Sequence, residues 1–193
     1  MAAAIAPLLI ALASFVLRLV NLGATKGYIF DEVYYVDGAR DLLKYGVEVS
    51  GSSPEFIVHP PVGKWLIGAG IALFGDNEFG WRFATALIGT LLILVFARLV
   101  HVLFYSPLLT ALGAALMALD GLLLVHSRTA LLDLFLTFFV LVGVLLWHRD
   151  RHWWAGLAFG LALGCKWSAV YFIAAIALIS LYRILVNMDV RDS

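Results

Sequence analysis

Long apolar segments constrain the fold of this chain more than any other feature of its sequence. A helix needs roughly 20 apolar residues to cross the hydrocarbon core of a bilayer. Six segments approach or reach that length: 5–22, 79–103, 107–125, 129–147, 153–165 with a few neighbouring residues, and 169–186. Of the 193 residues, 63% are hydrophobic and only 13% are charged, which is unusual for a soluble domain. The sequence therefore predicts an all-α, polytopic membrane protein with six membrane helices.

The charges of the chain balance, so their positions carry the information. Thirteen basic residues face thirteen acidic ones, and this balance gives no basic footprint for a nucleic acid partner. Lys and Arg are enriched on the cytoplasmic side of membrane helices. Alternate connections carry the basic residues: Arg98 with His101, the stretch 148–152, and Arg183 with Arg191. We therefore expect a cytoplasmic N-terminus and an extracytoplasmic loop after the first helix.

This first outer loop, about residues 24–78, is too long to be a simple connection. Its segment 32–45 has a helical pattern, whereas 47–55 is rich in Gly and Ser and predicts turns. The apolar part of segment 60–74 would cover only about 15 Å as a helix. We therefore predict an interfacial or re-entrant helix there, within a largely helical loop.

Four ionisable residues of this loop could carry chemistry. Adjacent carboxylates such as Asp31 and Glu32 lie about 100° apart on a helix, so one can act as a base while the other orients it or binds elsewhere. The alternative is two solvated acids. His59 precedes two prolines, which either aim its side chain or simply begin the next helix. Lys64 could meet a phosphate or extend to lipid headgroups.

Further ionisable residues lie at the outer ends of the apolar segments. Arg82 follows Glu78 by four residues, where a local salt bridge is the default, but a guanidinium can also grip two phosphate oxygens. Asp133 lies just inside an apolar segment, and such a buried charge usually faces a cavity or a partner. Asp120, followed by glycine, has the same claim but could merely end a helix. With Arg18, these residues converge toward one face and predict a shared polar cavity.

Several common cofactor and catalytic motifs are missing from the sequence. It contains no Gly-rich phosphate loop, no zinc ligand cluster and no Ser-His-Asp order. We therefore expect no metal and no other cofactor, and no soluble nucleotide as a donor.

Six short blocks resemble the protein O-mannosyltransferases, especially those of actinobacteria. The blocks are 30–32, 59–64, 76–83, 119–121, 127–133 and 164–168, and the resemblance extends over residues 17–182. It implies the GT-C type of transmembrane helix bundle, in a cell membrane. It also implies transfer of mannose from a polyprenyl (dolichyl-type) phosphate to Ser or Thr hydroxyls of secreted polypeptides. Members of the family are longer, so residues 1–193 are expected to be the N-terminal part of such a domain.

The resemblance also implies roles for individual residues. Asp31 would be the base that accepts the hydroxyl proton, and Glu32 would position the acceptor or the residues around it. Because a phosphate is already a good leaving group, the site needs cations more than a general acid. The candidate ligands of the donor phosphate or sugar are His59, Lys64, Arg82, Arg128 and Asp133. The lipid-linked mannose is then a substrate, and membrane lipids surround the protein.

Two other functions remain open from the sequence. A GT-C relative could transfer another lipid-linked sugar, such as an aminoarabinose, to a non-protein acceptor. A transport or scaffold subunit without catalysis is also possible. That second alternative predicts charges along a path through the membrane, whereas the charges of this chain gather toward one side.

Overall fold

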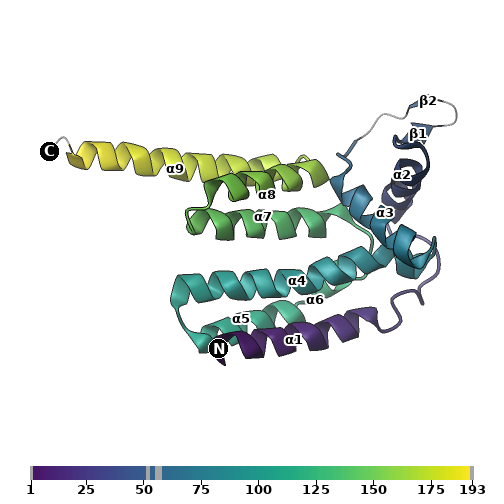
Figure 1. Cartoon of the computed structure of the whole chain (residues 1–193), viewed down its shortest axis with the longest axis horizontal. Coiled ribbons are helices and arrows are strands. Elements are labelled where there is room, and N and C mark those ends of the chain that lie inside the picture. Colours follow the sequence, from purple (N-terminus) through teal and green to yellow (C-terminus); the bar gives the residue numbers. More distant parts are fainter. Residues whose placement is uncertain (1, 51–52, 55–57, 192–193) are drawn as a thin grey trace.

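The fold is a bundle of helices with one polar end (Figure 1). The computed structural model describes residues 2–50, 53–54 and 58–191. Its elements are α1 (Ala2–Leu19), α2 (Glu32–Tyr45), β1 (Val49–Ser50), β2 (Ser53–Pro54), α3 (Val62–Phe74), α4 (Glu78–Phe104), α5 (Pro107–Leu119), α6 (Gly121–His126), α7 (Leu132–His148), α8 (His152–Cys165) and α9 (Ala169–Arg191).

The long helices lie side by side, and the loop elements gather at one end of them. Figure 1 shows α1, α4, α5, α7 and α8 running roughly along one axis, with α9 beside α8. At one end, which we call the polar end, lie α2, α3, the two-residue antiparallel hairpin of β1 and β2, and the connections 127–131 and 166–168. The opposite end holds the N-terminus and the α4–α5 and α7–α8 connections.

The helices are apolar, as predicted, but fewer of them than the predicted six are long enough to span a membrane. Within the described residues, two helices are long and apolar enough to cross a membrane, Glu78–Phe104 and Ala169–Val186. The shorter apolar helices are Ile5–Leu19, Val62–Phe74, Pro107–Leu119 and Leu132–His148. Six full-length spans are therefore not confirmed.

Apolar side chains cover much of the outside of the bundle. In α1, Leu8, Leu12 and Leu17 are all more than half exposed, and the spanning part of α9 is only 6% buried. Contiguous apolar surface of this kind is unfavourable in water and typical of a lipid or protein contact. The exposed faces of α1 and α9 thus agree with a membrane protein.

The segment predicted as one helix over 107–125 is divided at Asp120. This residue has extended backbone angles, ends α5 and caps α6, because its carboxylate accepts a hydrogen bond from the Leu123 amide at 2.6 Å. An N-cap of this kind satisfies an amide that the helix itself leaves unpaired. The single-helix prediction was therefore wrong, and Asp120 has the helix-ending role that was its alternative.

The outer loop folds largely as its pattern indicates. Helix α2 has the predicted bounds of 32–45, and α3 begins at Val62, directly after the two prolines. The predicted turn region 47–55 contains the short hairpin; residues 51–52 and 55 lie outside the described residues. Helix α3 lies obliquely across the polar end, next to α2 and α4.

Close packing fixes α2 and α3 against the bundle. A buried cluster joins Val36 of α2, Ile67 of α3 and Phe135 of α7. At Gly70 of α3 a Cβ atom would overlap the carbonyl oxygen of Gly80 in α4, so the two backbones approach as closely as glycine permits. This packing determines where the side chains of α2 point.

Candidate active site

The chain turns sharply just before the two adjacent carboxylates. Phe30 has a φ of 54°, which is uncommon for a residue with a side chain. Asp31 follows as the N-cap residue of α2, and its carbonyl accepts hydrogen bonds from the amides of Tyr34 and Tyr35. The side chains of Asp31 and Glu32 then diverge, so that Glu32 is fully buried and Asp31 is partly exposed.

Glu32 is the centre of a closed hydrogen-bond network, which we call the Glu32 hub. Arg82 binds it in a bidentate manner, with Nε 2.8 Å from Oε1 and Nη2 2.7 Å from Oε2. The backbone amides of Ile29 and Ala130 donate to the same carboxylate at 2.8 and 2.7 Å. The side chains of Glu32 and Arg82 are 0% and 1% exposed. The hub therefore joins α2, α4 and the connection before α7.

Arg82 is saturated within this hub. Its remaining donors bind the carbonyl oxygens of Leu22, Thr25 and Gly27 at 3.4, 2.9 and 2.9 Å. A guanidinium has five N–H groups, so none is left for a phosphate in this structure. The expected local pair with Glu78 is wrong, because Glu78 binds Lys26 and the Gly27 amide, each at 3.3 Å.

Asp31 has one oxygen bound and one oxygen free. The Tyr35 hydroxyl donates to Oδ2 at 3.3 Å, and Oδ1 has no hydrogen-bond partner within residues 2–50, 53–54 and 58–191. Burial, followed by the charges of Asp31 and Asp133, raises the pKa of Tyr35, so the phenol stays protonated as a donor. Tyr35 therefore holds one carboxylate oxygen of Asp31, and the other oxygen can accept a hydrogen bond from a ligand.

His59 lies beside this pair as a neutral imidazole. Its ring centroid is 5.9 Å from that of Tyr35. Burial, followed by the charges of Lys166 and Lys64, lowers the pKa of His59. Its Nδ1 atom is buried and has no hydrogen-bond partner in the part of the chain that the structure describes. The imidazole therefore has a free hydrogen-bonding atom next to Asp31.

Lys64 forms a buried ion pair with Glu48, and the two residues are 4% and 5% exposed. The pair packs on the backbone of α2, since a Cβ atom at Gly38 would come within 2.6 Å of Glu48 Oε2. Lys64 was predicted as a phosphate ligand, but in this structure its charge is already neutralised by Glu48.

Asp133 pairs with Lys166, which the sequence-based site did not include. Lys166 Nζ lies 2.8 and 3.0 Å from the two carboxylate oxygens of Asp133, and the two side chains are 23% and 45% exposed. The signal for Lys166 was its place in one of the resembling blocks, between two apolar segments. This pair is more accessible than the Glu48–Lys64 and Glu32–Arg82 pairs.

Arg128 binds the C-terminal end of α1. It donates to the carbonyl oxygens of Leu17, Arg18 and Asn21 at 2.9, 3.0 and 3.3 Å. A guanidinium there satisfies carbonyls that the helix leaves unpaired. Arg128 thus fixes the connection before α7 against α1, and three hydrogen bonds leave two of its five N–H groups without these partners.

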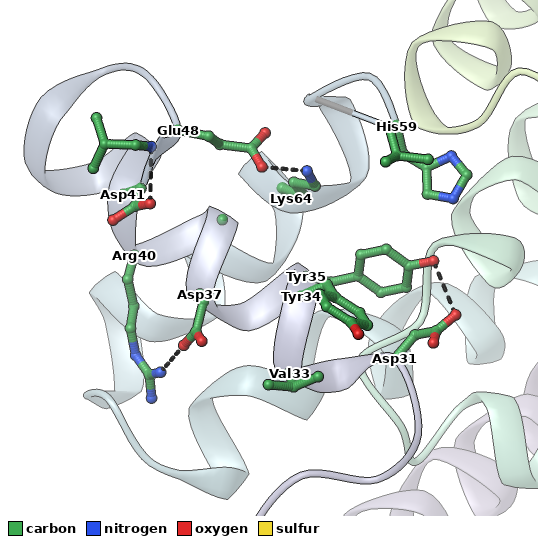
Figure 2. Close-up of a pocket in the computed structure, with 13 residues that line it drawn as sticks. Asp31, Val33, Tyr34, Tyr35, Asp37, Arg40, Asp41, Glu48, His59 and Lys64 are labelled. Carbon is green, nitrogen blue, oxygen red and sulfur yellow. Dashed lines mark hydrogen bonds and ion pairs between the residues drawn. The ribbon is translucent and has the colours of Figure 1, made fainter. Parts of the chain in front are cut away.

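A cavity of about 670 Å³ opens along one face of α2, and we call it the Asp31 cavity. Figure 2 shows Asp31, Tyr35 and His59 at one side of it and Arg40 and Asp41 at the other. Glu48 and Lys64 also line it. Of the predicted site residues, Asp31, His59 and Lys64 line this cavity, whereas Glu32 and Arg82 are buried outside its lining. The charges of Asp133 and Lys166 act on the His59 ring, so these two residues lie near the cavity. Its lining does not include Arg18, Arg82, Asp120 or Asp133, so the prediction that they share one polar cavity is not confirmed.

A protein-family model described as dolichyl-phosphate-mannose-protein mannosyltransferase matches residues 58–190. The chain belongs to this family. Curated relatives include the polyprenol-phosphate-mannose–protein mannosyltransferases of Mycobacterium tuberculosis, 40% identical over 86% of this chain and 38% of that protein, and of Corynebacterium glutamicum, 32% identical over 80% and 36%. The resemblance read from the six blocks is therefore confirmed.

A more distant relative transfers a different sugar. The undecaprenyl phosphate-alpha-4-amino-4-deoxy-L-arabinose arabinosyl transferase of Pseudomonas aeruginosa is 35% identical over 63% of this chain and 23% of that protein. The chain spans less than two fifths of the length of the mycobacterial and corynebacterial mannosyltransferases. No solved structure matches it significantly.

Proposed function

We propose that this chain forms the part of a protein O-mannosyltransferase that carries the catalytic base and meets both substrates. The donor is polyprenyl-phosphate-mannose, and the acceptor is a Ser or Thr hydroxyl of a secreted polypeptide. One observation carries the proposal: Asp31 presents a free carboxylate oxygen to a cavity, next to a neutral His59, at the end of the bundle where the charged residues gather.

The chemistry follows from this geometry. A Ser or Thr hydroxyl is a weak acid and needs a base within about 3 Å. Asp31 Oδ1 takes the hydroxyl proton while the hydroxyl oxygen forms a bond to the anomeric carbon of mannose. The bond from that carbon to the phosphate oxygen breaks, and its electron pair leaves with the lipid phosphate. Glu32 supports this step indirectly, because the hub fixes the start of α2.

The leaving phosphate needs positive charge near it. Lys64 and Arg82 are each bound to a buried carboxylate, so the geometry favours the more exposed cations. Lys166, held by Asp133, is the strongest of these, and Arg128 lies in the connection before α7, five residues before Asp133. We therefore propose Lys166 and Arg128 as the phosphate ligands, with Asp133 orienting Lys166.

The polar end faces away from the cytoplasm in this proposal. The basic stretch 148–152 connects α7 to α8 at the end of the bundle opposite α2 (Figure 1). Because Lys and Arg are enriched on the cytoplasmic side, this stretch supports a multi-pass protein of the cell membrane with a cytoplasmic N-terminus. Both substrates then meet Asp31 at the extracytoplasmic face.

A transfer assay tests the function. Membranes with the complete product of the gene that encodes this chain are incubated with radiolabelled polyprenyl-phosphate-mannose and a Thr-containing peptide. We expect labelled peptide, and a rate of labelling lower by about a hundredfold or more with Asp31→Asn. The similarity to the arabinosyl transferase makes undecaprenyl-phosphate-aminoarabinose, with a non-protein acceptor, the second donor to test. Transfer of that sugar, without transfer of mannose, would overturn the proposal.

A further inference from the structure

The Asp31 cavity carries an excess of negative charge. Four carboxylates line it against two cations, and burial and nearby lysines keep His59 neutral. Both cations are already bound: Lys64 by Glu48, and Arg40 by Asp37 and by Asp76, with Nε 2.8 Å from the Asp76 carboxylate. The carboxylates in the lining are Asp31, Asp37, Asp41 and Glu48. Such a cavity disfavours a phosphate and favours a neutral or cationic ligand.

Two buried atoms in the lining lack a hydrogen-bond partner among residues 2–50, 53–54 and 58–191. Glu48 is 5% exposed, and its Oε1 atom has none. The Nδ1 atom of His59 is buried in the same way. A buried polar atom without a partner is costly, and a carboxylate oxygen can only accept hydrogen bonds. These atoms point to a ligand that brings N–H or O–H donors into the cavity.

The face of α2 sets the length of this ligand. Asp31, Gly38 and Asp41 are spaced by seven and three residues, so they share one face of the helix. Ten helical residues cover about 15 Å. An extended polypeptide covers that distance in four to five residues, at about 3.3 Å each, and a Lys or Arg side chain shortens the required spacing further. Tyr34 offers an aromatic ring on the same lining, 70% exposed.

We propose that this cavity holds the acceptor polypeptide and selects a Lys or Arg about three or four positions away from the Ser or Thr that is mannosylated. The hydroxyl lies at Asp31, and the cationic side chain lies near Asp41 and Asp37. The lipid phosphate approaches from Lys166, outside the anionic cavity. This inference rests on the proposed function, because it takes Asp31 as the base.

A peptide series tests the selection. Each peptide has one Thr in a neutral background and one Lys, Gln or Glu placed one to seven positions away on either side. The complete gene product in detergent is assayed for mannose transfer, and the binding of fluorescent forms of the same peptides is measured separately. We expect Lys to raise kcat/KM about three- to fivefold over Gln at three or four positions on one side. Glu at the same position lowers it, and added salt weakens both effects.

A pair of variants locates the selection in the cavity. Asp41→Asn keeps an oxygen for the Val49 amide, which Asp41 now binds at 3.1 Å, but removes the charge. It should bring kcat/KM for the Lys peptide down to that for the Gln peptide. The matched control is Asp150→Asn, at a 94% exposed side chain in the α7–α8 connection, and it should leave the ratio unchanged.

The possible outcomes distinguish a failure of the peptide selection from a failure of the proposed mannosyltransferase function. Transfer to all peptides with equal kcat/KM and equal binding overturns the selection and leaves the mannosyltransferase standing. Preferential binding of the Lys peptide without any mannose transfer supports the selection and removes the proposed function. A preference that survives Asp41→Asn overturns the assignment of the cavity.

Discussion

Two carboxylates that are neighbours in the chain lie in regions of opposite character. In the Glu32 hub every polar side-chain atom has a partner, and the two charged side chains are at most 1% exposed. In the Asp31 cavity, Glu48 and His59 have buried atoms that find no partner among the described residues. Proteins pair nearly all of their buried polar groups, so unpaired ones need a reason. The hub has the properties of a structural element, and the cavity has those of a site that a ligand completes.

The Glu32 hub also fixes the position of Asp31 in the cavity. The hub joins the start of α2 to α4 and to the Ala130 amide before α7. Asp31 is the residue directly before Glu32, so the hub determines where its carboxylate lies. The proposal thus assigns a stabilising role to Glu32 and a catalytic role to its neighbour Asp31.

The largest effect on activity is expected for Asp31→Asn, which tests whether Asp31 and Glu32 differ in role. The change keeps the size of the side chain and its bond to Tyr35, but removes the base. Loss of a general base usually costs about 10²- to 10⁴-fold in rate. We expect this loss in kcat for mannose transfer by the complete gene product, with an unchanged melting temperature in detergent. Asp150→Asn serves as the control. Full turnover by the Asp31 variant would show that Asp31 is not the base, and the proposed difference in role between Asp31 and Glu32 would be wrong.

The next largest effect is expected for Glu32→Gln. This change leaves the Arg82 guanidinium buried without its counter-charge, and breaking a buried pair in this way costs about 3–5 kcal/mol. Thermal unfolding in detergent should show the loss. A double variant that also carries Arg82→Met should regain part of it, because both charges are then gone. A Glu32→Gln protein that is as stable as the wild type but binds its donor poorly would place the hub within the substrate site.

Sequence patterns could predict the parts of this structure that depend on neighbouring residues. The bounds of α2 follow from its helical pattern, and the start of α3 follows from the prolines before it. The gathering of Asp31, His59 and Asp133 at one end follows from the order of apolar and polar segments. The helix bounds depend on local propensity, and the end of the bundle at which a residue lies depends on the order of the segments. Both can be read from the sequence.

Pairings across the fold could not be predicted in the same way. Arg82 has a carboxylate four residues earlier, yet it pairs with Glu32, fifty residues away, because burial makes a fully bonded partner far more valuable. Lys64 likewise finds Glu48 in a segment predicted only as turns. The partner of Asp133 is Lys166 because α7 and α8 form a packed hairpin. Each of these pairings is decided by tertiary packing.

A smaller effect, on the donor side, is expected for Lys166→Gln. A hydrogen bond to a charged group contributes about 1.5–3 kcal/mol, so KM for the lipid donor should rise about tenfold or more. KM for the acceptor peptide should stay the same, because Lys166 does not line the Asp31 cavity. Lys26→Gln, at a side chain 77% exposed, is the matched control. If only the KM for the peptide rose, Lys166 would belong to the acceptor site and not to the donor site.

The smallest effect is expected at Tyr35, which connects the packed core to the cavity. The residue is 4% exposed and belongs to the buried cluster with Val36 and Ile67, while its hydroxyl donates to Asp31 at 3.3 Å. Tyr35→Phe keeps the ring and removes only this bond, which is worth about 0.5–1.5 kcal/mol. We therefore expect kcat to fall about two- to tenfold and the melting temperature to change little.

A matched variant separates the hydroxyl of Tyr35 from the removal of a phenol elsewhere on the helix. Tyr34→Phe removes a hydroxyl from a side chain that is 70% exposed on the same helix, and its kcat should stay at the wild-type value. Full turnover by Tyr35→Phe would show that Asp31 acts without the hydrogen bond from Tyr35, and that another group holds its carboxylate.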